Sequence, residues 1–111
     1  MIIRSTGAVT GPTLSDEQLA MLRALLDEQR QFRVEQLAAA ISTDDGTDAD
    51  HEIQDTILRG ARLALADIEA ALARMATGQY GRCVQCGTRI PLARLEILPQ
   101  AAYCMACQPR D

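Results

Sequence analysis

The chain has 111 residues, a net charge of −4 and a pI of about 4.9. Apolar residues make up 48%, but only one Phe, two Tyr and no Trp occur, so Ala and Leu supply most of the apolar surface. This length allows one domain, or a rod with a small knob. The composition favours closely paired helices over a thick globular core. The acidic balance argues against nucleic-acid binding through general charge and favours a protein partner with a basic surface.

The N-terminal segment shows no helical or strand periodicity. Residues 1–13 contain Gly7, Gly11 and Pro12, and we expect them to form a flexible N-terminal arm. The segment lacks the apolar stretch of a signal peptide, and no apolar run approaches the length of a membrane span. We therefore expect a cytoplasmic protein without membrane contact, in which thiols stay reduced.

The next segment, residues 14–41, is predicted to be a long helix. Ser15 followed by Gln18 has the form of a capping box, and Asp16 and Glu17 suit the positive end of the helix dipole. Apolar residues then recur at mostly helical spacing. They are Leu19, Leu22, Leu25, Leu26, Phe32, Leu37 and Ile41. We expect this stripe to form core.

Residues 42–50 read STDDGTDAD, a turn with Gly46 at its centre. A second helix is predicted from about Asp50 to Thr77, and Gly78 occupies the usual position just beyond its end. Its apolar seam has the 3-and-4 spacing of a coiled coil. The seam comprises Ile53, Ile57, Ala61, Leu65, Ile68, Leu72 and Met75. Residues 14–77 are thus predicted to form an antiparallel coiled-coil hairpin, so that the fold is mainly α.

The turn at 42–50 concentrates acidic residues at one end of this rod. They are Asp44, Asp45, Asp48 and Asp50. One interpretation is local, because Asp forms turns and caps helices. The other is a partner-binding tip, which would bring negative charge to a bound Mg²⁺ or to a cluster of Arg and Lys. The residues alone leave both interpretations open.

All four cysteines lie in the last third of the chain. Cys83 and Cys86 form one C-x2-C pair, Cys104 and Cys107 form another, and 17 residues separate the pairs. This spacing is typical of a structural zinc site, in which four thiolates close a tetrahedron around one Zn²⁺. Such a site leaves no open position for activating water, so we expect no enzymatic activity. His51, the only histidine, is not needed as a ligand.

Two other interpretations of the cysteines are weaker. Disulfides do not fit a chain without a signal peptide, and a redox-active C-x-x-C motif normally accompanies a βαβ pattern that is missing here. We predict a C4 zinc finger over residues 78–111, with a short helix over residues 92–97 between Pro91 and Pro99. Its small core would consist of Leu92, Leu95, Ile97 and Leu98.

The segment around the first cysteine pair also resembles a known family. Residues 71–87, ALARMATGQYGRCVQCG, match the form A-L-x-R-[IM]-x-x-G-x-Y-G-x-C-x-x-C-G that opens the DksA/TraR zinc finger. The pattern continues through Ile90-Pro91, Arg94-Leu95-Glu96 and Pro99 to the second pair. At the tip, residues 45–50 resemble the family motif D-x-x-D-x-A, with Asp50 in place of the final Ala.

The resemblance implies a transcription regulator that binds bacterial RNA polymerase without sequence-specific DNA contact. Family members insert the hairpin into the secondary channel, often acting together with the alarmone ppGpp; the sequence does not decide whether this chain binds ppGpp. An alternative is a zinc-stapled protein-interaction module of the same family that has lost polymerase modulation. That module could act as a homodimer through exposed helix faces.

Overall fold

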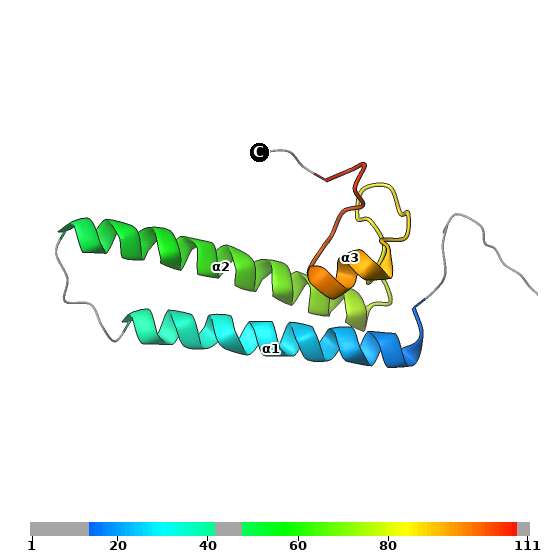
Figure 1. Ribbon diagram of the computed structural model, residues 1–111, viewed down its shortest axis with the longest axis horizontal. Helices are drawn as coiled ribbons and strands as arrows, with labels where there is room; N and C mark the ends of the chain where they lie inside the picture. The colour runs from blue at the N-terminus through cyan, green and yellow to red at the C-terminus, as the bar shows by residue number, and fades with distance from the viewer. Residues whose placement is uncertain (1–13, 42–47, 109–111) are drawn as a thin grey trace, which may run out of the picture.

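The computed structural model describes residues 14–41 and 48–108. Three helices occur in these ranges: α1 spans Asp16–Ile41, α2 spans Asp48–Ala76 and α3 spans Leu92–Ile97. Figure 1 shows α1 and α2 side by side and antiparallel, with α3 and its loops packed against the end where α1 begins and α2 ends. The molecule measures 65 × 29 × 21 Å. The predicted mainly α hairpin fold is confirmed.

Both helix ends predicted from local signals form as expected, although each helix differs by one or two residues from the predicted range. The Ser15 N–H donates to Oε1 of Gln18 at 2.9 Å, and the Gln18 N–H donates to Oγ of Ser15 at 3.1 Å. This reciprocal pair is a capping box, so α1 starts at Asp16 and not at Leu14.

None of the described helices combines the length and apolarity needed to cross a bilayer.

The end of α2 is fixed by Gly78. The Gln79 N–H donates to the Arg74 carbonyl at 2.8 Å, and the Gly78 N–H donates to the Met75 carbonyl at 3.3 Å. These two bonds form a Schellman motif, which requires the left-handed backbone that Gly78 adopts with φ of +77°. The chain therefore turns away from the rod immediately after α2 and enters the cysteine-rich segment.

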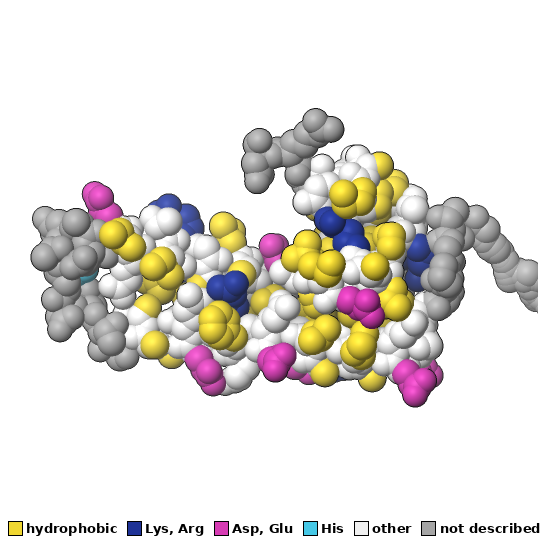
Figure 2. Space-filling view, viewed as in Figure 1, with side chains coloured by type: hydrophobic (Ala, Val, Ile, Leu, Met, Phe, Trp, Pro, Cys, Tyr) yellow, Lys and Arg dark blue, Asp and Glu magenta, His cyan; other side chains and the backbone are white. Residues whose placement is uncertain are grey.

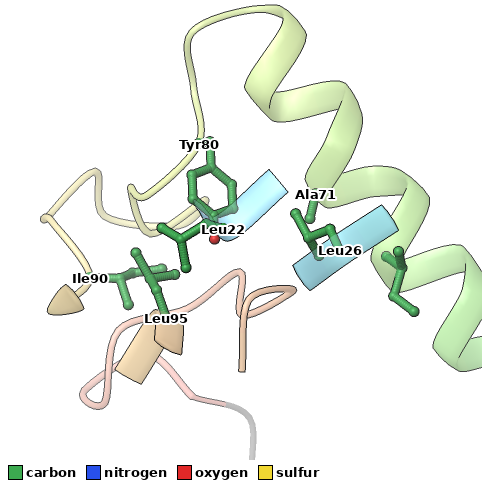
Figure 3. Close-up of a cluster of buried hydrophobic side chains, with 7 residues drawn as sticks. Leu22, Leu26, Ala71, Tyr80, Ile90 and Leu95 are labelled. Carbon is green, nitrogen blue, oxygen red and sulfur yellow. The ribbon is translucent and has the colours of Figure 1, made fainter. Parts of the chain in front are cut away.

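The buried core lies at the base of the hairpin, the end where α1 begins and α2 ends, and includes residues from the cysteine-rich segment. Figure 3 shows side chains of both helices meeting those of the finger. The cluster consists of Leu22, Leu26, Ile68, Ala71, Tyr80, Ile90 and Leu95. One cluster thus spans the hairpin and the finger, so the described part of the finger shares its core with the hairpin.

Several residues predicted to be core are instead exposed. In the hairpin, Phe32 is 60% exposed, and Ile53 and Ile57 are also exposed. The reason is the rotation of α2: Gln54, not Ile53, faces α1, and its Nε2 donates to the Ala40 carbonyl at 2.9 Å. Further along α2, Ala61 is buried as predicted.

The miniature core predicted for the finger is wrong at two of its four positions. Ile97 is 78% exposed and Leu98 is 39% exposed. Leu95 is fully buried, and Leu92 packs partly buried against the shared cluster. A six-residue helix offers one narrow face to the hairpin. Leu95 lies on that face, whereas Ile97 and Leu98 line an open cleft beside the hairpin and stay exposed to solvent.

The predicted arm, residues 1–13, lies outside the described residues, as do Asp44 and Asp45 of the predicted tip. Asp48 and Asp50 belong to the first turn of α2.

Candidate metal centre and its supports

The structure brings all four predicted cysteines together. Their Sγ atoms lie within 4.8 Å of one another, and they form the one such cluster of potential metal ligands in the described part of the chain. Cys86 Sγ and Cys104 Sγ, from different pairs, are 3.7 Å apart. Zinc–sulfur bonds of about 2.3 Å in a tetrahedron place sulfurs roughly 3.8 Å apart, so this spacing fits Zn²⁺.

Two short turns present the thiols. In the first, the Gly87 N–H donates to the Cys83 carbonyl at 2.9 Å and the Cys83 N–H donates to the Thr88 carbonyl at 2.8 Å. Gly87 has φ of +79°, a left-handed conformation that glycine adopts without steric cost. In the second, the Cys107 N–H donates to the Cys104 carbonyl at 3.1 Å. Each turn therefore directs a pair of sulfurs toward one point.

A single backbone contact aligns the two turns. The Val84 N–H in the first turn donates to the Ala102 carbonyl, just before the second turn, at 2.8 Å. The Ile90 N–H donates to the Gly81 carbonyl at the same distance, which closes the first turn into a small hairpin. These bonds hold the sulfurs near each other through the backbone.

The electrostatics of the cluster suit a cation. Burial opposes ionisation of Cys83, but hydrogen bonds from the backbone of Cys104, Cys86 and Gln85 outweigh it and lower the pKa of Cys83 to about 6. Hydrogen bonding to the side chain and then the backbone of Thr88 lowers the pKa of Cys86. Its Sγ lies 3.1 Å from Oγ1 of Thr88. Hydrogen bonding thus favours the thiolate form of both Cys83 and Cys86, the form that binds a metal.

The raised pKa of the Cys107 thiol indicates that four adjacent thiolates need a metal ion to balance their charge. Hydrogen bonds with the thiols of Cys104, Cys86 and Cys83 raise the pKa of Cys107 to about 12. Four thiolates at these distances repel one another, and a divalent cation removes that repulsion. These four cysteines would hold one structural Zn²⁺, which would supply folding free energy.

Arg74 attaches the finger to the rod, Tyr80 stabilises the finger from within, and neither role was predicted from the residues. The buried Tyr80 hydroxyl donates to the Pro99 carbonyl at 2.8 Å. Nη2 of Arg74 lies 3.4 Å from the Ala101 carbonyl and 3.5 Å from the Gln100 carbonyl. Arg74 lies near the end of α2, and Tyr80 lies four residues beyond that helix, inside the finger. The three acceptors are consecutive residues before the second cysteine turn. Position in the family motif was the available signal for both residues.

Comparison with known proteins agrees with this geometry. The family model for the prokaryotic dksA/traR C4-type zinc finger matches residues 78–111. The structure of transcription factor DksA2 from Pseudomonas aeruginosa matches with a TM-score of 0.71 and 28% identity, over 83% of this chain and 81% of that one. An uncharacterized protein from Aquifex aeolicus (strain VF5) is 36% identical over 56 residues, which are 50% of this chain and 39% of the relative. The matched segment thus spans about two fifths of that relative.

Proposed function

We propose that the chain is a transcription regulator of the DksA/TraR zinc-finger family, and that it binds bacterial RNA polymerase in the cytoplasm and regulates transcription from the secondary channel. The observation that carries this proposal is the shape of the whole molecule. A stiff helical rod bears the zinc finger at one end, and the rod and finger match the fold of DksA2 over most of both chains.

The dimensions support insertion of the rod. At 1.5 Å per residue, α1 with its 26 residues is about 39 Å long and α2 with its 29 residues is about 44 Å long. The longest axis of the molecule is 65 Å, and the next is 29 Å. A rod of this shape suits a narrow channel that the broader finger end cannot enter, so the finger would set the depth of insertion.

The acidic turn is the part that would enter first. We propose that Asp44, Asp45, Asp48 and Asp50 form the partner-binding tip and act on basic groups or on bound Mg²⁺ near the polymerase active site. The net charge of −4 makes the protein a poor ligand for nucleic acid and a good one for a basic channel. The mechanism would be binding and allosteric adjustment without catalysis.

The first test is competition for core RNA polymerase between the zinc-loaded chain and an established secondary-channel factor. Mutually exclusive binding is the expected result. Simultaneous binding of both, or no binding at all, would overturn the proposed site.

The second test separates the tip from the rod. Replacing Asp45, Asp48 and Asp50 with Ala should leave the helical content and zinc content unchanged and abolish the effect on transcription. A control with the same change of charge, Glu17, Asp27 and Asp55 to Ala, alters exposed positions along the rod and should keep the effect. Equal activity of the two triple variants would refute the tip.

A further inference from the structure

Several large apolar side chains remain exposed along one side of the rod and on α3. We call this set the apolar face; it consists of Phe32, Ile53, Ile57, Ala64, Ile97 and Leu98. All except Ala64 are among the exposed large hydrophobic residues of the chain. Figure 2 shows hydrophobic side chains along the rod and gathered around α3 on the viewed side. Contiguous apolar patches on a soluble chain usually mark an interaction surface.

The residues of α2 form a continuous line. Ile53, Ile57, Gly60 and Ala64 follow one another at steps of 4, 3 and 4, which places them on one side of the helix. Gly60 is exposed, and a Cβ built there would meet no atom within 4 Å. The middle of the line is therefore open to a side chain from another molecule.

At its end nearer the finger, the line leads into a cleft. The cleft has a volume of about 440 Å³, and its apolar walls include Ala64, Phe32, Ile97 and Leu98. Its walls thus come from all three helices: Phe32 belongs to α1, Ala64 to α2 and Ile97 to α3, and Leu98 directly follows α3. The half-exposed Phe32 ring stands at the edge of a cavity large enough for an aromatic side chain.

Two opposite charges lie at this cleft. Glu28 and Arg33 both line it. The Arg33 guanidinium carbon lies 5.3 Å from the centre of the Phe32 ring, and Nη1 of Arg33 donates to Oε1 of Gln36 at 3.0 Å. Glu28 forms no ion pair within the described ranges, 14–41 and 48–108. The polar rim of the cleft therefore carries one acid and one base.

We propose that the apolar face binds the same face of a second copy of this chain and forms a reversible two-fold dimer. A two-fold interface places one surface against itself. Glu28 of one copy can then meet Arg33 of the other, twice per dimer, while Phe32 of each copy enters the opposite cleft. A partner surface of a single charge would leave one of these two groups unpaired, so the charge pattern favours self-association.

The size of the face indicates a weak dimer. From Ile53 to Ala64 the line on α2 is roughly 17 Å long at 1.5 Å per residue. An interface of this length falls at the small end of specific protein interfaces, where transient association is the rule. We therefore expect dissociation in the micromolar range, so that free monomers coexist with the dimer. The dimer does not depend on the proposed binding to polymerase.

The test is analytical ultracentrifugation of the zinc-loaded full chain from low micromolar to near-millimolar concentration. The wild type should show a concentration-dependent monomer–dimer equilibrium. Phe32→Ser with Ile97→Ser should be monomeric throughout, with unchanged helical and zinc content because both side chains are exposed. Leu63→Ser is the matched control: Leu63 is 63% exposed but is not part of the apolar face, and this variant should dimerise like the wild type.

Charge exchange tests the pairing itself. Glu28→Arg should weaken the dimer at least tenfold by setting two cations against each other, and the double exchange with Arg33→Glu should restore it. A wild type that stays monomeric at every concentration overturns the proposal. So does a dimer that survives Phe32→Ser with Ile97→Ser, or a double exchange without rescue. If the wild type is monomeric and these substitutions weaken polymerase binding, the face belongs to the polymerase and not to a second copy.

Discussion

Replacing Tyr80 with Phe should destabilise the protein by about 1–3 kcal/mol. The substitution removes the hydroxyl that donates to the Pro99 carbonyl at 2.8 Å and leaves the carbonyl of a buried residue without that donor. A buried acceptor without a donor lowers the free energy of unfolding by about 1–3 kcal/mol, because it has lost its hydrogen bonds to water and forms none in the protein. For a domain of this size, a loss of about 1.5 kcal/mol lowers Tm by roughly 6–12 °C.

The same hydroxyl gives a second, independent signature in alkaline solution. Burial raises the pKa of Tyr80 to about 12, against an opposing effect of the Arg74 charge. A group whose pKa is higher in the folded state contributes stability that is complete below its unfolded pKa, near 10, and is lost as pH rises through 12. Between pH 9 and pH 11 the wild type should lose about 1.3 kcal/mol more than Tyr80→Phe.

The assay is urea unfolding of the zinc-loaded protein, followed by circular dichroism at several pH values. Tyr103→Phe is the control, since Tyr103 is half-buried and its hydroxyl has no hydrogen-bond partner in the described part of the chain. It should change stability by less than about 0.5 kcal/mol. If Tyr80→Phe behaves like Tyr103→Phe and both unfold with the same pH dependence as the wild type, the buried hydrogen bond is not formed in solution.

Two further predictions concern the rod and the metal. Gly60→Ala should stabilise the protein by about 0.5–1 kcal/mol in urea unfolding at low protein concentration, because a Cβ there meets nothing within 4 Å. Gly78→Ala should destabilise the protein, because the φ of Gly78 is +77°. Equal effects of the two substitutions on stability would contradict the assigned end of α2. Removing zinc with a chelator, or replacing Cys107 with Ser, should lower the melting temperature of the rod as well as that of the finger, since Leu95 packs in the same cluster as Leu22. Helical ellipticity that melts unchanged without zinc would show that the two parts are uncoupled.

The amino-acid sequence by itself determined the features that depend on local chemistry. The spacing of the four cysteines specified a C4 site, and the structure brings their sulfurs together. Ser15 and Gln18 predicted the start of α1, and Gly78 predicted the end of α2. The two helix-end signals involve atoms only a few residues apart, and the cysteine signal rests on residue type and spacing, so no knowledge of the rest of the fold was needed.

The tertiary structure alone decided which apolar residues are buried. Helical periodicity placed Phe32, Ile53 and Ile57 in the core, but all three are exposed. The apolar stripe on each helix is wider than the seam between two helices, so the rotation of α2 against α1 selects the buried part, and that rotation turns Gln54 toward Ala40.

The attachment of the finger was likewise beyond the reach of the sequence. The bond from Arg74 of α2 to the Ala101 carbonyl joins residues 27 apart, and the shared cluster brings Leu95 to Leu22 from opposite ends of the chain. No local spacing encodes such contacts, because they exist only after the helices have paired and the finger has folded onto their base. Sequence therefore specified the parts and their ends, and packing decided which apolar surfaces were buried and which stayed exposed.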